Sequence, residues 1–130
     1  MIVVDASALV ELLVGGTPRG ARIAARIRSE TLHAPHLVDL EVLSVLRTLE
    51  ARQALASSLA SQAAADVVAL AMTRYPHEPL AARIWQLRGN LTAYDASYVA
   101  LAEILAVPLV TCDARLAGAP GHRASIELVA

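Results

Sequence analysis

The sequence predicts an α/β fold of three layers, in which a central, mainly parallel sheet of four or five strands is flanked by helices. Short runs rich in Val, Leu and Ile alternate with longer segments whose apolar residues recur at helical spacing. Strands that alternate with helices are typical of a parallel sheet with right-handed crossovers. The length of 130 residues favours one domain, which we place over residues 1–130.

The first expected strand covers residues 1–4. Its four successive apolar residues predict a strand that is buried on both faces, and Asp5 follows at its carboxyl end. Apolar residues at helical spacing then predict a helix that runs to residue 14. Two glycines end this helix. Thr17 and Pro18 have the residue types of an N-cap and a first helical position, so a second helix begins there.

The remaining elements are separated by prolines and glycines. Pro35, Pro76 and Pro108 interrupt periodic segments, and Gly89 with Asn90 ends another one. We therefore expect helices over 18–29, 36–53, 57–72, 77–88 and 92–106, a helical turn over 114–116, and strands over 31–34, 109–111 and 126–129. Strands 1–4 and 109–111 are each followed by an aspartate.

Composition excludes several classes of protein. Apolar residues make up 56% of the chain, yet no segment has the roughly 18 uninterrupted apolar residues of a membrane span, so no membrane contact is expected. The high apolar share suggests that a partner covers part of the surface. The single cysteine, Cys112, excludes an internal disulfide and fits a reducing cytoplasm. A net charge of −1 argues against binding nucleic acid by charge alone.

The helix expected over 36–53 contains an unusual carboxylate. Its apolar residues cover most of the circumference, which predicts a helix that is buried nearly all round. Glu41 lies in the middle of this run, and buried carboxylates are uncommon unless they are paired or bind a cation. Asp39 lies on another face near the helix start, where it favours the helix dipole, and we interpret it as structural.

Four carboxylates are candidates for one site: Asp5, Glu41, Asp95 and Asp113. Each also has a structural explanation. Asp5 and Asp113 could be N-caps, Asp95 could complete a capping box with Thr92, and Glu41 could pair with an arginine. Taken together these explanations are less favoured, because the carboxyl ends of parallel strands meet at one edge of the sheet, where ligands bind.

Gathering four carboxylates requires compensation. At a separation of ~5 Å and an effective dielectric constant of ~20, each pair repels by about 3 kcal/mol. A divalent cation removes this cost, and ligands that are all oxygen select Mg²⁺ or Mn²⁺ over Zn²⁺. The hydroxyls of Ser7 and Thr111 are close in sequence to Asp5 and Asp113, so they could orient a carboxylate or a bound water.

Four segments in order carry a resemblance to a known family. They are IVVDASALV (2–10), PHLVDLEVLSVLR (35–47), LTAYDASYVALAE (91–103) and PLVTCDARL (108–116). With them the chain resembles the PIN-domain ribonucleases, and more closely the VapC-like toxins of type II toxin–antitoxin modules. The resemblance covers nearly the whole length.

The resemblance implies a function and a set of site residues. Asp5, Glu41, Asp95 and Asp113 match metal-binding and catalytic positions, and Ser7 and Thr111 match positions that support the site. The implied activity is Mg²⁺-dependent endonucleolytic cleavage of RNA by a metal-activated water. The implied partners are a VapB-like antitoxin and a second copy of the chain. Two alternatives stay open: a PIN-type nuclease that processes RNA without an antitoxin, and a PIN domain that binds metal or RNA without cleaving.

Contacts to RNA are expected from arginines. The candidates for phosphate contacts are Arg19, Arg22, Arg26 and Arg115, although the first three could equally form a solvated helix face. The aromatic residues Tyr94, Tyr98 and Trp85 are expected to pack in the core or in an interface. Few aromatic side chains are then left to stack on bases. This favours recognition of RNA by its shape, as in a structured loop of tRNA or ribosomal RNA.

Overall fold

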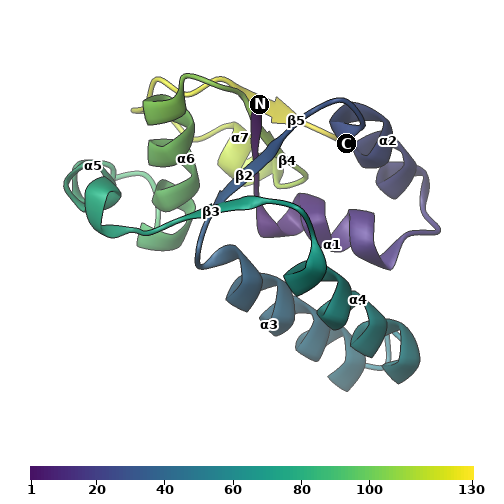
Figure 1. Ribbon diagram of the computed structural model, residues 1–130. Helices are drawn as coiled ribbons and strands as arrows, with labels where there is room; N and C mark the ends of the chain where they lie inside the picture. Colours follow the sequence, from purple (N-terminus) through teal and green to yellow (C-terminus); the bar gives the residue numbers. More distant parts are fainter.

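The computed structural model describes all 130 residues and has a five-stranded, fully parallel sheet in the order β3-β2-β1-β4-β5 (Figure 1). This confirms the predicted fold class. The elements are β1 (Ile2–Val4), α1 (Ala6–Val14), α2 (Pro18–Ile27), β2 (Leu32–Pro35), α3 (Val38–Ala51), α4 (Ser57–Ala69), β3 (Thr73–Tyr75), the 3₁₀ helix η1 (Glu78–Leu80), α5 (Ala81–Gln86), α6 (Ala93–Leu105), β4 (Leu109–Thr111), α7 (Ala114–Ala117) and β5 (Ile126–Leu128).

Strand β1 lies at the centre of the sheet, and its three side chains are buried, as its apolar sequence predicts. It pairs with β2 on one side and with β4 on the other. The chain builds the sheet outward through β2 and β3, then crosses over to β4 and β5. The direction of winding therefore reverses between β1 and β4. In an open parallel sheet, the crevice that binds ligands lies outside the strand ends at such a point.

Helices cover both faces of the sheet. Helix α6 packs on β1, β2 and β4, whereas α1 packs on β4 and on the helices α2, α3 and α4. In Figure 1, α6 lies on one side of the strands and α1 and α2 lie on the other. The predicted start of α2 is confirmed, because the Thr17 hydroxyl accepts a hydrogen bond from the Gly20 N–H and Pro18 is the first helical residue.

Strand β3 was not expected from the sequence. The helix predicted over 57–72 ends at Ala69, and Thr73–Tyr75 forms an edge strand that pairs with β2. An edge strand pairs on one side only, and none of its three side chains is fully buried, so it lacks the apolar run that identifies a central strand. The Tyr75 hydroxyl lies 2.7 Å from Nδ1 of His33 on β2, which ties the two strands together.

The expectation that the helix over 36–53 is buried nearly all round is wrong. Helix α3 buries Val38, Val42 and Leu46, because only one of its faces meets α1 and α4. Leu40 is 69% exposed, and Leu43 and Val45 are exposed as well. Part of the apolar excess thus lies on the surface. None of the helices combines the length and the hydrophobicity that are needed to cross a lipid bilayer.

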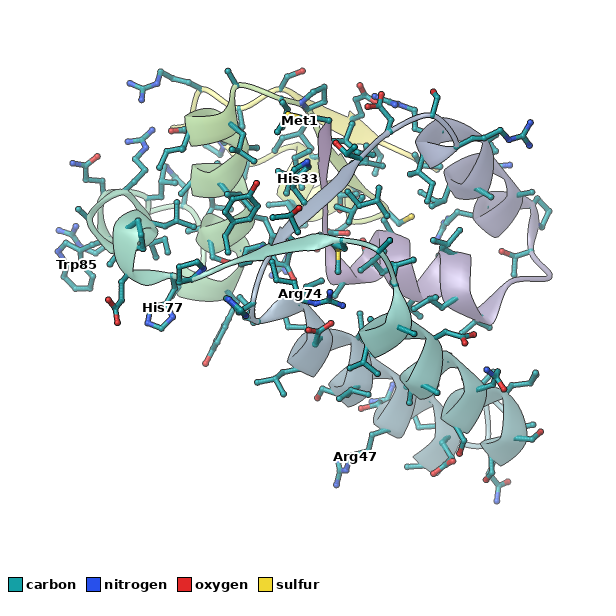
Figure 2. The ribbon with its side chains drawn as sticks, in the orientation of Figure 1. Met1, His33, Arg47, Arg74, His77 and Trp85 are labelled. Atoms are coloured by element: carbon teal, nitrogen blue, oxygen red, sulfur yellow. The ribbon has the colours of Figure 1, made fainter.

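Arg74 on β3 joins the start of α3 to the end of α4 (Figure 2). Its Nε and Nη2 donate to the two carboxylate oxygens of Asp39 at 2.7 and 3.0 Å. The same guanidinium donates to the carbonyls of Val67, Leu70 and Met72 where α4 ends. The structural role predicted for Asp39 is confirmed by this ion pair.

Replacing Arg74 should destabilise the fold. Arg74→Ala leaves Asp39 without its partner and three carbonyls without their donor, so we expect the free energy of unfolding to fall by about 2–4 kcal/mol. Urea denaturation followed by circular dichroism measures the change. The matched control is Arg47→Ala on the exposed side of α3, which should cost less than about 0.5 kcal/mol. Equal losses in the two variants would contradict the role of Arg74.

Candidate active site

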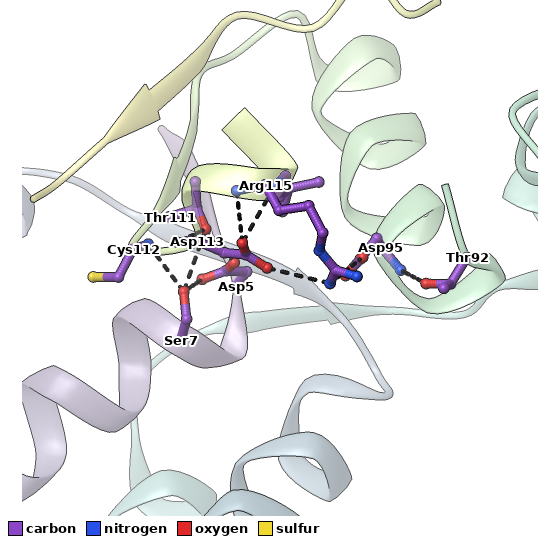
Figure 3. A network of polar contacts seen from close by, with 9 residues as sticks. Asp5, Ser7, Thr92, Asp95, Thr111, Cys112, Asp113 and Arg115 are labelled. Atoms are coloured by element: carbon purple, nitrogen blue, oxygen red, sulfur yellow. Dashed lines mark hydrogen bonds and ion pairs between the residues drawn. The ribbon is translucent and has the colours of Figure 1, made fainter. Parts of the chain in front are cut away.

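Asp5 is buried at the carboxyl end of β1, where its backbone N–H donates to the Val110 carbonyl on β4 at 3.3 Å. One carboxylate oxygen, Oδ1, accepts hydrogen bonds from the Ala8 N–H at 3.0 Å and from the Ser7 hydroxyl at 2.7 Å. The other, Oδ2, accepts one from the Thr111 hydroxyl (Figure 3). Asp5 is therefore the N-cap of α1, and its carboxylate also belongs to a polar network between the two strand ends.

The hydroxyls of Ser7 and Thr111 complete this network. Thr111 is fully buried, and its Oγ1 accepts a hydrogen bond from the Asp113 N–H at 2.9 Å. The Ser7 Oγ accepts one from the Cys112 N–H at 2.9 Å. Each hydroxyl thus binds Asp5 with its proton and the chain after β4 with its oxygen. Both side chains hold the carboxyl ends of β1 and β4 in one arrangement.

Asp95 and Asp113 both lie beside the guanidinium group of Arg115. Asp113 is the N-cap of α7, because its Oδ1 accepts from the N–H groups of Arg115 and Leu116 at 2.9 and 3.3 Å. The Nη2 of Arg115 lies 3.4 Å from Oδ2 of Asp95 and 3.5 Å from Oδ2 of Asp113 (Figure 3). Thr92 is the N-cap of α6, where its hydroxyl accepts from the Asp95 N–H. The Asp95 carboxylate points to Arg115, so it does not close a capping box.

Glu41 is half-buried on α3 and receives a hydrogen bond from α6. The Tyr98 hydroxyl donates to its Oε1 at 2.5 Å. Sequence reasoning did not identify this contact, although Tyr98 follows Asp95 by three residues and so lies on the same helix face. Burial raises the pKa of Glu41, and the charges of Asp95 and Asp5 raise it further, against the hydrogen bond from Tyr98.

Contacts join three of the four carboxylates: Asp5 and Asp113 both bind the Thr111 hydroxyl, and Asp95 and Asp113 both pair with Arg115. Burial raises the pKa of Asp5, the three hydrogen bonds to its carboxylate lower it, and the charge of Asp113 raises it again. Because Glu41 senses Asp5 and Asp95, every member is coupled to at least one other. The structure thus places Asp5, Asp95 and Asp113 in one polar network, and Glu41 is held to α6 by Tyr98; that the four form one site stays a prediction.

The cluster fits a hard divalent cation in the kind of its donors, which are carboxylate oxygens. As the side chains stand, no three acidic, histidine or cysteine side chains are placed to share one ion. The negative charges of Asp95 and Asp113 are instead balanced by Arg115, whose side chain is 77% exposed. An exposed arginine moves away at small cost, so it can give way to a cation.

The other predicted RNA contacts lie elsewhere. Three of these arginines lie on helix α2. Arg19 donates to Glu11, and Arg22 donates to the Ala130 carbonyl. Arg26 donates to both Glu127 and Glu30. Their contact with phosphate stays a prediction.

The three aromatic residues expected in the core or in an interface differ from one another. Tyr98 is buried in the core, as expected. Trp85 and Tyr94 are 67% and 63% exposed, so they do not pack in the core, and their packing in an interface stays a prediction.

Comparison with known proteins identifies relatives along the whole chain. The model of the PIN domain family matches residues 2–121. Ribonuclease VapC12 of Mycobacterium tuberculosis is 48% identical over 130 residues, which is 100% of both chains. Among solved structures, PAE2754 from Pyrobaculum aerophilum is 30% identical with a TM-score of 0.69, over 96% of this chain and 81% of its own. VapC20 of Mycobacterium tuberculosis, a sarcin–ricin loop cleaving toxin, has the same TM-score at 18% identity, over 95% and 99% of the two chains, which is a likeness of fold.

The Thr111 hydroxyl should be necessary for stability. Thr111→Val keeps the shape but removes the donor to Asp5 and the acceptor of the Asp113 N–H, so we expect a loss of about 2–3 kcal/mol in the free energy of unfolding. Thr111→Ser keeps the hydroxyl and loses one methyl, which should cost about 1 kcal/mol. Urea denaturation of both variants measures the difference. A Ser variant less stable than the Val variant would contradict the network.

Proposed function

This chain belongs to the PIN-domain family and to the VapC ribonucleases within it, and on that basis we propose that it is a metal-dependent endoribonuclease, the toxin of a type II toxin–antitoxin pair. The observation that carries the proposal is the cluster of Asp5, Glu41, Asp95 and Asp113 at the point where the sheet changes its winding direction. Such a crevice is where open parallel sheets bind their ligands.

The proposed cofactor is Mg²⁺, with Mn²⁺ as the possible substitute. Asp5, Asp95 and Asp113 would hold it together with Glu41, since all four offer only oxygen donors. When bound, such a cation supplies an acidic water for attack on the phosphodiester and neutralises charge on its oxygens. The metal would also relieve the repulsion from Asp95 and Asp5, which adds to burial in raising the pKa of Glu41.

The residues around the carboxylates have separate proposed roles. Ser7 and Thr111 keep the Asp5 carboxylate in one orientation by donating to its two oxygens. The Tyr98 hydroxyl, on α6, would keep the Glu41 carboxylate in one orientation by donating to its Oε1. Arg115 balances Asp95 and Asp113 as long as they carry unpaired charge, and once they bind a cation its guanidinium is available to an RNA phosphate.

The proposed partners follow from the surface. A structured loop of tRNA or ribosomal RNA remains the proposed substrate. The exposed Leu40, Leu43 and Val45 of α3 support the proposal that a second copy or a VapB-like antitoxin covers this face. The proposed compartment is the cytoplasm. The toxin is favoured over a processing nuclease because the relatives that match the full length are VapC ribonucleases.

Neutralising single carboxylates tests catalysis. Asp5→Asn keeps an acceptor for the Ala8 N–H, so it should fold, yet it removes one charge from the cluster. We expect cleavage of RNA by the pure protein in Mg²⁺ to fall by at least about 100-fold in Asp5→Asn and in Asp95→Asn. Asp66→Asn on α4, away from the site, is the matched control. Full activity in either site variant would exclude the proposed reaction.

Metal binding is testable without activity. A ligand of the folded state at about ten times its Kd adds about 1.4 kcal/mol, so Mg²⁺ or Mn²⁺ should raise the melting temperature by several degrees. The shift should shrink in Asp95→Asn and persist in Asp66→Asn. It should grow in Arg115→Ala, because no guanidinium then has to leave the space between Asp95 and Asp113. The absence of any shift at millimolar metal would count against the site.

A further inference from the structure

Arg115 is held far more loosely than the arginines that join elements of the fold. Arg26, Arg74 and Arg83 each donate through two nitrogens to both oxygens of one carboxylate at 2.7–3.0 Å, and their side chains are 19–31% exposed. Arg115 instead offers one nitrogen, Nη2, to two carboxylates at 3.4 and 3.5 Å, and its side chain is 77% exposed. Exposed ion pairs contribute little to stability, so this guanidinium can exchange its partners at small cost.

The two oxygens that Arg115 contacts have no other hydrogen-bond donor. Oδ1 of Asp113 accepts the capping N–H groups of α7, whereas its Oδ2 contacts only Arg115. Oδ2 of Asp95 also contacts only Arg115, since Thr92 caps α6. Figure 3 shows the guanidinium beside both carboxylates. A metal ion shared by the two aspartates would need the oxygens that lie around Nη2, so the metal and Arg115 exclude each other.

The Arg115 side chain has space to turn away from the two aspartates. Its backbone is fixed, because its N–H donates to Oδ1 of Asp113 at 2.9 Å. The side chain lines a hollow of about 390 Å³ between the start of α6 and α7, together with the exposed Arg88 and Asn90. Asp95 is the only carboxylate in the lining. A guanidinium in this hollow can bind a phosphate through two N–H groups while it stays next to the site.

We propose that RNA and the metal bind cooperatively, because both require Arg115 to leave Asp95 and Asp113. The inference rests on the proposed ribonuclease function and adds a coupling between its two ligands. An RNA phosphate that draws the guanidinium away uncovers oxygens for the metal, and a metal that displaces the guanidinium frees it for phosphate. Since binding free energies are linked, each ligand raises the affinity for the other by the same factor.

The coupling makes the affinity for metal depend on the substrate. The free protein holds its metal weakly, because the guanidinium competes for the same oxygens, and it gains affinity when a polyanion is present. In the metal-free protein, the same guanidinium reduces the repulsion between the two aspartates and an approaching RNA strand. Arg115 is therefore a positioning residue that admits the metal together with RNA.

Titration with Mn²⁺ measures the coupling without catalysis. Electron paramagnetic resonance counts the free Mn²⁺ for the wild type and for Arg115→Ala, each with and without a single-stranded ten-nucleotide 2′-O-methyl phosphorothioate RNA. Mn²⁺ bound by the oligomer alone is subtracted, and gel electrophoresis verifies that the oligomer stays intact. Without RNA, we expect Arg115→Ala to bind Mn²⁺ about 3- to 10-fold more tightly than the wild type. The oligomer should tighten Mn²⁺ binding at least about 3-fold more in the wild type than in the variant.

Arg88→Ala is the matched control for charge. Arg88 lines the same hollow but contacts no carboxylate, and its guanidinium instead stacks on the Trp85 ring and donates to the Trp85 carbonyl. Each variant loses one positive charge near the site. We expect Arg88→Ala to keep the wild-type affinity for Mn²⁺ within about 2-fold, because salt screens a charge that makes no contact. Equal tightening in Arg88→Ala and Arg115→Ala would overturn the inference. Melting curves verify that both variants fold.

The outcomes separate this inference from the proposed function. RNA cleavage by a protein whose affinity for Mn²⁺ is the same with Arg115 or Ala would leave the ribonuclease intact and overturn the coupling. An Arg115-dependent coupling without cleavage of RNA would support the inference while the ribonuclease proposal fails. No binding of Mn²⁺ by either protein at millimolar concentration would overturn both.

Discussion

Mutual repulsion among carboxylates, one of them buried, is the constraint on which the rest of this structure depends. Parallel strands β1 and β4 end side by side; Asp5 directly follows β1, and Asp113 follows β4 after Cys112. The chain compensates with neutral donors where the site is buried and with a cation where it is open. Ser7 and Thr111 donate to Asp5 in the interior, whereas an exposed arginine balances the outer pair. Burial nevertheless raises the pKa of Asp5 against these hydrogen bonds.

The same residues serve the fold and the proposed chemistry. Asp5 and Asp113 cap the helices that follow them, and their carboxylates also face the crevice. A capping carboxylate uses one oxygen for the N–H groups of the first turn and leaves the other for another partner. The structural and functional explanations of these residues are therefore compatible. For Asp95 they differ, because Thr92 caps the helix and the carboxylate is left free to face the site.

Two kinds of exposed apolar surface account for the high hydrophobicity of the chain. The outer face of α3 is aliphatic and lies on the helix that carries Glu41. The pocket beside α6 is lined by two exposed aromatic rings, Trp85 and Tyr94, and Arg88 stacks on the ring of Trp85. Aliphatic faces of this kind suit another protein surface.

Local patterns in the sequence were enough to predict the central strands and the start of α2, because hydrophobic periodicity and capping residues act over a few positions. The sequence also singled out four carboxylates, whose role as one site stays a prediction. The edge strand β3 was missed, since its pairing with β2 leaves no apolar signature. The burial of α3 was overestimated, because an apolar sequence does not say which faces meet neighbours. Only the tertiary structure decided that Tyr98 supports Glu41, that Arg115 balances two aspartates, and that Trp85 lies in the open. Such contacts join elements far apart in the chain, so no local pattern encodes them.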